Sequence, residues 1–303
     1  RTLLAQDYPA DKIDIWFYSD ASTDGTDDEL AELATREPRI EWVRGETRAG
    51  KPTALNELAA RATGEVLVLT DIRQELSTSA ISDLVAALAD ETVGCAGGLL
   101  ELEGQTGAGA YWRYERWIRA SESRFRSVVG VSGSLYAIRA TDFPRLPADI
   151  LLDDLYVPMT VRLGGRRVIL VSSAIAIDHA AGDGREFARK VRTLAGHNQL
   201  VSRLPRLLVP GVNPSWFELC SHKLARLLCP WALIGIAVVS VTGAAESRWL
   251  AGLAIAQALC YGAALAGRLL GPVGSLARTF VVLNSAAVVG LFRWLRGSQR
   301  VTW

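Results

Sequence analysis

The chain has 303 residues, with 33 lysines and arginines against 32 acids and a formal net charge of +1. This balance lacks the basic excess that is typical of nucleic-acid partners, so no such partner is predicted. The four cysteines have no CxxC spacing and the three histidines are scattered, so neither a disulfide framework nor a zinc site is predicted.

The sequence begins at Arg1, in what reads as the tail of a helix, and we expect it to be truncated at its N-terminus. Apolar runs and helical patterns then alternate, which indicates βαβ units and a mostly parallel α/β sheet over residues 1–210. The predicted strands are 13–19, 40–43, 66–70, 93–102, 135–139, 167–171 and 174–177, and the predicted helices are 26–36, 52–62, 79–89, 110–126, 152–163 and 185–202.

The last part of the chain changes character, because acids almost vanish after Trp216. Apolar stretches at 227–245, 249–270 and 280–295 approach the roughly 20 residues that cross a bilayer as a helix. We predict an amphipathic linker over 211–226 and a membrane region over 227–303. The alternative is that these stretches are buried helices of a large soluble core.

Lysines and arginines cluster just before the first apolar stretch, which predicts an integral membrane protein whose residues 1–210 are cytoplasmic. Three crossings would carry Arg296 and Arg300 to the opposite side, against the same tendency. An alternative is therefore that one apolar stretch lies in the membrane interface. A bacterial inner membrane is the expected location.

The apolar run VLVLT ends abruptly at Asp71, and Arg73 stands two residues later. Ligands of open α/β sheets bind beyond the carboxyl ends of such strands, so Asp71 is a candidate binding residue. Asp20 and Asp24 flank a Ser/Thr-rich turn after an earlier strand and could contact a nucleobase or ribose. An N-cap or Asx turn would explain Asp24 equally well.

The segment GETRAGKP, residues 45–52, nearly matches the phosphate loop GxxxxGK[ST] and raises the alternative of a P-loop NTPase. Against it, Pro52 stands where a magnesium-binding hydroxyl is needed and also lacks an N–H for the phosphate cradle. Lys51 either meets a phosphate or is a solvated residue at the start of a helix.

Asp153 and Asp154 open a predicted helix, where the helix dipole favours acids and capping is an alternative role. Two adjacent carboxylates repel, which can raise the pKa of one, and Asp154 is the candidate general base. Arg192 could supply a fixed guanidinium to a diphosphate, although a solvated face explains it too. Trp112 lies in an aromatic helix that could stack on sugars, rest at the membrane or pack in the core.

Taken in order, SDASTDGT, GKPTALN, VLVLTDIRQ, VSGSLYAIR, LLDD and RKVRT resemble the inverting family 2 glycosyltransferases. The resemblance is to their membrane-embedded branch, with the cellulose, chitin, hyaluronan and poly-N-acetylglucosamine synthases. It implies a GT-A fold with a Rossmann-like sheet, followed by transmembrane helices. It also implies sugar transfer from a nucleotide-diphosphate donor, often UDP-linked, to a hydroxyl of a glycan or lipid-linked acceptor, with a divalent cation, Mg²⁺ or Mn²⁺.

Carried over by position, the resemblance implies a role for each motif residue. Asp154 is the catalytic base with Asp153 beside it, and Asp71 is the first acid of the DxD motif, near the metal and the diphosphate. The implied donor-binding residues are Asp20, Asp24, Lys51, Asp71, Arg73 and Arg192. The implied acceptor-binding residues are Gly133, Ser134 and Trp112.

Some positions depart from the family pattern. Arg73 replaces the second DxD acid, which weakens the metal prediction, although one carboxylate plus phosphates can hold magnesium. The QxxRW motif appears as Arg189, Arg192 and Thr193, which argues against long-chain synthesis. The family's first strand is missing, so we expect the fragment to be unstable or inactive as written. A catalytically inactive scaffold is the remaining alternative.

Overall fold

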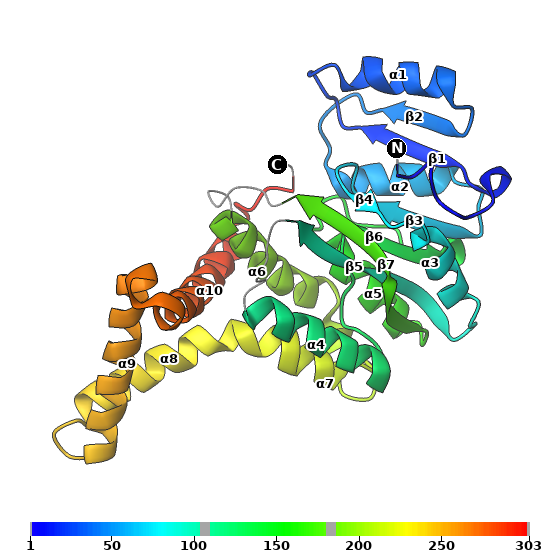
Figure 1. The fold of residues 1–303 in the computed structure, drawn as a ribbon. Coiled ribbons are helices and arrows are strands. Elements are labelled where there is room, and N and C mark those ends of the chain that lie inside the picture. Colours follow the sequence, from blue (N-terminus) through cyan, green and yellow to red (C-terminus); the bar gives the residue numbers. More distant parts are fainter. Residues whose placement is uncertain (1, 104–109, 180–185, 302–303) are drawn as a thin grey trace. The chain divides into compact units, whose positions relative to one another are not determined.

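A computed structural model describes residues 2–103, 110–179 and 186–301 (Figure 1). The chain forms two compact units that interleave along the sequence. The first unit comprises Arg1–Ala181, Arg203–Glu218 and Arg300–Trp303, and the second comprises Gly182–Ser202 and Leu219–Gln299.

The first unit begins with a small parallel sheet of two strands, drawn in blue in Figure 1. Helices α1 and α2 follow the two strands, as the alternating pattern predicts. The elements here are η1 (Ala10–Lys12), β1 (Ile15–Ser19), α1 (Thr26–Arg36), β2 (Ile40–Arg44) and α2 (Lys51–Arg61).

A second, five-stranded sheet has the order β3-β6-β5-β7-β4. Its elements and connecting helices agree with the predicted ones to within a few residues, except for the two-residue strand β4, which the sequence pattern did not indicate. The elements are β3 (Val66–Thr70), β4 (Glu75–Leu76), α3 (Ala80–Leu88), β5 (Val93–Glu103), α4 (Ala110–Phe125), β6 (Leu135–Arg139), η2 (Ala140–Asp142), α5 (Asp153–Leu163) and β7 (Arg167–His179).

The prediction of a mostly parallel sheet is right for β1 with β2 and for β5 with β7. It is wrong for β6, which runs antiparallel to both β3 and β5, and for β4. Side-chain periodicity carries no information on strand direction, which the pairing partners decide. The reversal has a consequence for the site, because Leu135 at the start of β6 pairs with Thr70 at the end of β3.

The predicted strands 167–171 and 174–177 are one strand, β7, with an irregularity in its register. Val171 pairs with Gly98 and Ile175 with the next residue, Leu99, so three residues of β7 bulge out of the ladder. A Cβ on Gly98 would lie 2.8 Å from the Ala174 carbonyl oxygen. Glycine at this position therefore makes room for the bulge.

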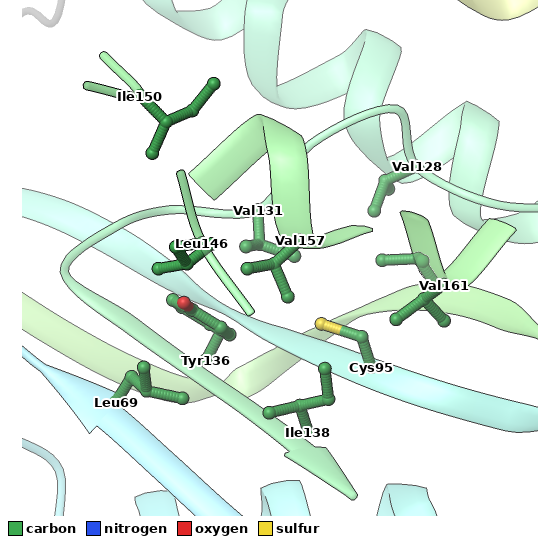
Figure 2. Packing of buried hydrophobic residues seen from close by; sticks show 11 residues of the cluster. Leu69, Cys95, Val128, Val131, Tyr136, Ile138, Leu146, Ile150, Val157 and Val161 are labelled. Carbon is green, nitrogen blue, oxygen red and sulfur yellow. The ribbon is translucent and has the colours of Figure 1, made fainter. Parts of the chain in front are cut away.

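Alternate residues of the central strands feed two separate cores, one on each face of the sheet. Tyr136 and Ile138 face one core together with residues of α5, whereas Leu135 and Ala137 face the core that α3 covers. Figure 2 shows the first core, in which the Tyr136 ring lies near Leu69 and Leu146. The sheet is thus covered by helices on both faces, as expected for an α/β domain.

Within the described residues, β1 pairs only with β2, and β3 pairs on one side only, with β6. The first unit is completed late in the sequence by the segment that contains η4 (Pro205–Leu208) and α7 (Trp216–Glu218). Ser215 of this segment accepts a hydrogen bond from Nε of the buried Arg162 on α5, over 3.0 Å.

The second unit is helical. It contains α6 (Glu186–Arg203) and the π-helical turn η5 (Leu219–Leu224), which leads into α8 (Ala225–Thr242). The later elements are α9 (Arg248–Ala266), η6 (Gly267–Leu270) and α10 (Gly271–Leu295). Helix α6 packs on α10 through Val191 and Leu194, and a Cβ on Gly290 would lie 3.0 Å from the Val191 carbonyl. Small residues permit this close approach of two helix backbones.

Three helices, 216–242, 248–266 and 271–295, are long and apolar enough to cross a membrane. The first begins inside the predicted linker 211–226, and the third begins nine residues before the predicted start at residue 280. Polar residues explain both differences, because His222, Lys223 and Arg278 lower the local hydropathy without ending the helix.

Candidate active site

Lys51 lies at the centre of the candidate site, on the first residue of α2. Its Nζ atom donates to Oδ1 of Asp71 over 2.8 Å and to the carbonyl oxygen of Gly133 over 3.1 Å. Oδ2 of Asp153 lies 3.5 Å away. The structure therefore brings together residues of four predicted motifs, GKPTALN, VLVLTDIRQ, VSGSLYAIR and LLDD, around one ammonium group.

The direction of β6 brings the VSGS segment to this position. Because β6 starts opposite the end of β3, the residues just before it, Gly133 and Ser134, lie beside Asp71. Thr70 Oγ1 donates to the carbonyl oxygen of Ser134 over 2.8 Å and fixes this arrangement. A Cβ on Gly133 would lie 3.6 Å from both Lys51 Nζ and Asp154 Oδ2, so Gly133 lies next to both of these side chains.

Asp153 and Asp154 form the first turn of α5, which has no side-chain cap. Asp153 is 8% exposed, whereas Asp154 is half-buried. The Asp154 carbonyl accepts a hydrogen bond from the Val131 N–H over 3.0 Å, which ties the VSGS segment to the start of α5. The helix dipole stabilises both carboxylates here, so the capping interpretation and the catalytic interpretation share one geometry.

Asp20 holds the loop in front of Lys51. Its two carboxylate oxygens accept hydrogen bonds from the N–H groups of Ala49 and Gly50, over 2.8 and 3.0 Å. Gly50 has φ 84° and ψ 166°, a conformation that is essentially restricted to glycine. A phosphate loop needs these N–H groups for its anion, so the P-loop NTPase interpretation is wrong.

Asp24 and Arg73 have partners within the chain. Asp24 accepts hydrogen bonds from the hydroxyl and N–H of Thr26, which lower the pKa of its carboxyl below the ordinary value. This is the helix-start role that was the alternative for Asp24. Arg73 Nη2 lies 3.3 Å from Oδ2 of Asp178 on β7. Contact of either residue with a donor stays a prediction.

Arg192 and Trp112 are the two further predicted residues. Arg192 lies on α6, in the second unit. Trp112 lies on α4, and its side chain falls outside the described part of the chain. Their roles in binding the diphosphate and the acceptor stay predictions.

Sequence reasoning missed two residues that shape the site. The Asn56 side chain on α2 donates to and accepts from the backbone of Leu146, both over 2.8 Å, which anchors α2 to the segment before α5. Tyr136 is fully buried, and its hydroxyl has no hydrogen-bond partner among the residues that the structure describes. The position of Asn56 in the GKPTALN motif was the only sequence signal for it, whereas Tyr136 reads as an ordinary core residue.

The charge state of Lys51 depends on its burial and on three nearby acids, Asp71, Asp153 and Asp154. Burial lowers the pKa of Lys51, but Asp153 and Asp71 raise it, and the net pKa lies above the ordinary value. Lys51 therefore stays charged at neutral pH. Asp71 and Asp153 supply hard oxygen ligands, and Oδ2 of Asp153 accepts no hydrogen bond, which fits Mg²⁺ or Mn²⁺. No described group of three or more ligating side chains could hold an ion by itself, so donor phosphates would have to complete its coordination.

Residues 1–140 match the family model described as Glycosyl transferase family 2. Beta-monoglucosyldiacylglycerol synthase from Synechocystis sp. is 32% identical over 96 residues, which cover 31% of this chain and 20% of that protein. The synthase of the same name from Nostoc sp. is 29% identical over 96 residues, with the same coverage. The match therefore spans about a fifth of the length of these curated relatives.

A mannosyltransferase from Pyrobaculum calidifontis, solved with GDP-Man and Mn²⁺, superimposes with a TM-score of 0.77 at 26% identity. This match covers 98% of this chain and 82% of that one. TarS residues 1–349 from S. aureus, solved with UDP-GlcNAc, give a TM-score of 0.53 at 13% identity over 98% and 86% of the two chains. The second likeness concerns the fold alone.

The fold, the order of the motifs and the match over residues 1–140 agree. Residues 1–140 thus match the family 2 glycosyltransferases, and the chain has the GT-A fold. The fold class and the family predicted from the six motifs are thereby confirmed, and so is the prediction of helices suited to a membrane. Among the solved structures described above, the chain is most similar to the mannosyltransferase from Pyrobaculum calidifontis.

Proposed function

We propose that this protein is an inverting glycosyltransferase that moves a sugar from a nucleotide-diphosphate donor to a hydroxyl of a membrane lipid or lipid-linked glycan. One observation carries the proposal, namely the meeting of Lys51, Asp71 and the Asp153–Asp154 pair at the end of β3, within a family 2 domain. Acids and a fixed cation at a strand end suit the transfer of a group whose leaving diphosphate is anionic.

Asp154 is the better candidate for the general base of the two adjacent acids. Asp153 is almost fully buried, and its Oδ2 lies 3.5 Å from the Lys51 ammonium. Asp154 is half-buried and lies next to Gly133, where an acceptor hydroxyl could approach. A base must reach the proton that it removes, and this requirement favours Asp154.

Asp20 holds the loop that precedes Lys51. Lys51 would face the diphosphate of the donor, and Asp71 would hold the divalent cation. When bound there, such a cation supplies positive charge to the departing diphosphate. The resemblance implies a UDP-sugar, whereas the mannosyltransferase relative was solved with GDP-Man, so the nucleotide is part of the test. Arg192 is proposed as a further diphosphate contact and Trp112 as a sugar contact.

We further propose that the three apolar helices anchor the protein in a bacterial inner membrane, with the first unit in the cytoplasm. The lysines and arginines that precede the first apolar stretch support this orientation. The relatives named beta-monoglucosyldiacylglycerol synthase support an acceptor that resides in the bilayer.

The test is transfer by the full chain in lipid nanodiscs, measured as nucleotide release and as radiolabelled sugar in extracted lipid. Donors are a panel of UDP- and GDP-sugars, each with and without EDTA. We expect one donor class to react, and Asp154→Asn to reduce the rate by about 100-fold or more while nucleotide binding persists. Asp11→Asn is the matched control, because Asp11 is exposed on η1 and belongs to none of the predicted motifs, so it should leave the rate nearly unchanged.

An inactive scaffold predicts a different pattern. The ion pair of Arg73 with Asp178, in place of a second acid near Asp71, is the observation that keeps this alternative open. The enzymatic proposal would be contradicted if the wild-type protein binds nucleotide but releases no nucleotide from any donor sugar in every lipid tried. Equal activity of Asp154→Asn and wild type would contradict the assignment of the base.

A further inference from the structure

The Lys51 ammonium occupies a position that is built from oxygen atoms. An ammonium group has three N–H donors, and three oxygens surround this one. They are Oδ1 of Asp71 at 2.8 Å, the Gly133 carbonyl at 3.1 Å and Oδ2 of Asp153 at 3.5 Å. The oxygens come from three segments of the first unit that are far apart in sequence. Only the folded chain creates this position.

The same oxygens are the ligands that a hard divalent cation prefers, namely carboxylates and a backbone carbonyl. Oδ2 of Asp153 accepts no hydrogen bond from the described residues although Asp153 is 8% exposed, and its nearest cation is Lys51 at 3.5 Å. A metal ion would bind at about 2.0 to 2.6 Å from these oxygens, too close for the ammonium to remain. Lys51 and a cation therefore cannot occupy this position together.

We propose that Lys51 is a built-in counterion that competes with the divalent cation for Asp71 and Asp153. In the free protein the ammonium neutralises the acids and keeps the cation out. When a nucleotide diphosphate binds, its phosphates attract Lys51 and the carboxylates become available. The inference rests on the proposed function and adds an order of events, in which the cation binds tightly only together with the donor.

Arg73 contributes to the same balance. It stands two residues after Asp71, where a second acid would have added a ligand, and its guanidinium lies 3.3 Å from Oδ2 of Asp178. The loop after β3 thus offers a cation one carboxylate and carries one fixed positive charge. Because the loop has one acid instead of two, it attracts a free divalent cation less strongly. The Lys51 ammonium alone is then enough to keep such a cation from the oxygens of Asp71 and Asp153.

The experiment measures Mn²⁺ binding to the full chain in detergent by electron paramagnetic resonance, without donor or acceptor. Lys51→Met removes the ammonium and keeps the length of the side chain. We expect the variant to bind Mn²⁺ more tightly than wild type, by on the order of tenfold or more. Lys12→Met is the matched control, because Lys12 is exposed on η1, and its binding should equal that of wild type. Asp71→Asn should abolish the gain.

A second arm adds UDP or GDP. In wild type either nucleotide should tighten Mn²⁺ binding strongly, whereas in Lys51→Met the additional gain should be smaller, because no ammonium has to move. If Lys51→Met does not fold, Lys51→Gln keeps two N–H donors for Asp71 and Gly133 and should shift the affinity in the same direction. Equal or weaker Mn²⁺ binding in a folded Lys51 variant would overturn the proposal. Because no sugar is transferred, this result does not depend on whether the protein is an active enzyme.

Discussion

Tyr136 places a buried hydroxyl in the apolar core. Its ring packs among apolar residues of the first core (Figure 2), and none of the described residues is hydrogen-bonded to its hydroxyl. Burial raises the pKa of this hydroxyl well above its ordinary value, and the nearby Asp153 carboxylate raises it further. The group is therefore neutral, and its lost hydration is not replaced by a protein partner.

Removing this hydroxyl is expected to stabilise the protein. A buried polar group without a partner costs about 1 to 3 kcal/mol, so Tyr136→Phe should raise the free energy of unfolding by roughly 1 kcal/mol. Thermal unfolding followed by near-ultraviolet circular dichroism measures the change. Ser127→Ala is the control with the opposite sign, because the buried Ser127 hydroxyl accepts a hydrogen bond from the Val168 N–H over 3.0 Å. A loss of stability in Tyr136→Phe would mean that the hydroxyl has a partner in solution.

At the scale of elements, a proline in α5 explains how this helix holds a loop. In an α-helix each N–H pairs with the carbonyl four residues earlier, so residue 158 would pair with Asp154. Pro158 has no N–H, which leaves the Asp154 carbonyl for another donor. The Val131 N–H takes this position over 3.0 Å. The proline thus exchanges a bond within the helix for a bond to the VSGS segment.

Replacing Pro158 should reverse this exchange. In Pro158→Ala the new N–H competes for the Asp154 carbonyl, so we expect the Val131 amide to exchange with deuterium at least about tenfold faster. Transfer should slow through a higher KM for the acceptor, because the segment that carries Gly133 becomes less firmly held. Pro205→Ala is the control, because Pro205 lies at the start of η4, where a missing N–H matters little. Unchanged protection of Val131 would contradict this account.

Local pattern was enough to predict most of the elements. The strand that ends before Asp71, and the helix that starts at Asp153, followed from apolar runs and their polar boundaries. The direction of β6 did not follow, since alternation of side chains is the same for either direction. The start of α10 was misplaced because Arg278 interrupts the apolar pattern without interrupting the helix.

The sequence indicated residues of the candidate site but not the contacts between them. Asp20 and Asp71 stand at the ends of apolar strands, and that position marks them in the sequence as candidates. The partner of Asp20 was not predictable, because the N–H groups of Ala49 and Gly50 lie 29 and 30 residues further along. The contact of Lys51 with Gly133 spans 82 residues and depends on the antiparallel direction of β6. Contacts of this range are set by packing of the whole unit.

At the scale of the whole molecule, the two units differ sharply in charge. The second unit carries eleven lysines and arginines against three acids, although the complete chain is nearly neutral. It also contains a fully buried histidine, His197 on α6. Burial lowers its pKa to about 3, and the positive charges of Lys223 and Arg226, together with His222, act in the same direction. His197 is therefore neutral in the folded protein.

This pKa predicts acid sensitivity. An unfolded histidine titrates near 6.5, so between pH 6.5 and 3 the unfolded state binds a proton that the folded state does not. The contribution of His197 to stability is thus complete above pH 6.5 and falls by up to about 1.4 kcal/mol per pH unit below it. Thermal unfolding in detergent at pH 7 and pH 4 should show a smaller drop for His197→Gln than for wild type. Equal drops would show that His197 is accessible to protons in the fold.

The late segment that completes the first unit has a consequence for biosynthesis. Arg162 lies on the same helix as Asp153 and Asp154, and its buried guanidinium needs Ser215, which is made more than fifty residues later. The first membrane-length helix begins at the next residue, Trp216. Since domains fold as units while the chain emerges, the first unit can be completed only as this helix is being made. Completion of the first unit and synthesis of the first membrane-length helix thus coincide.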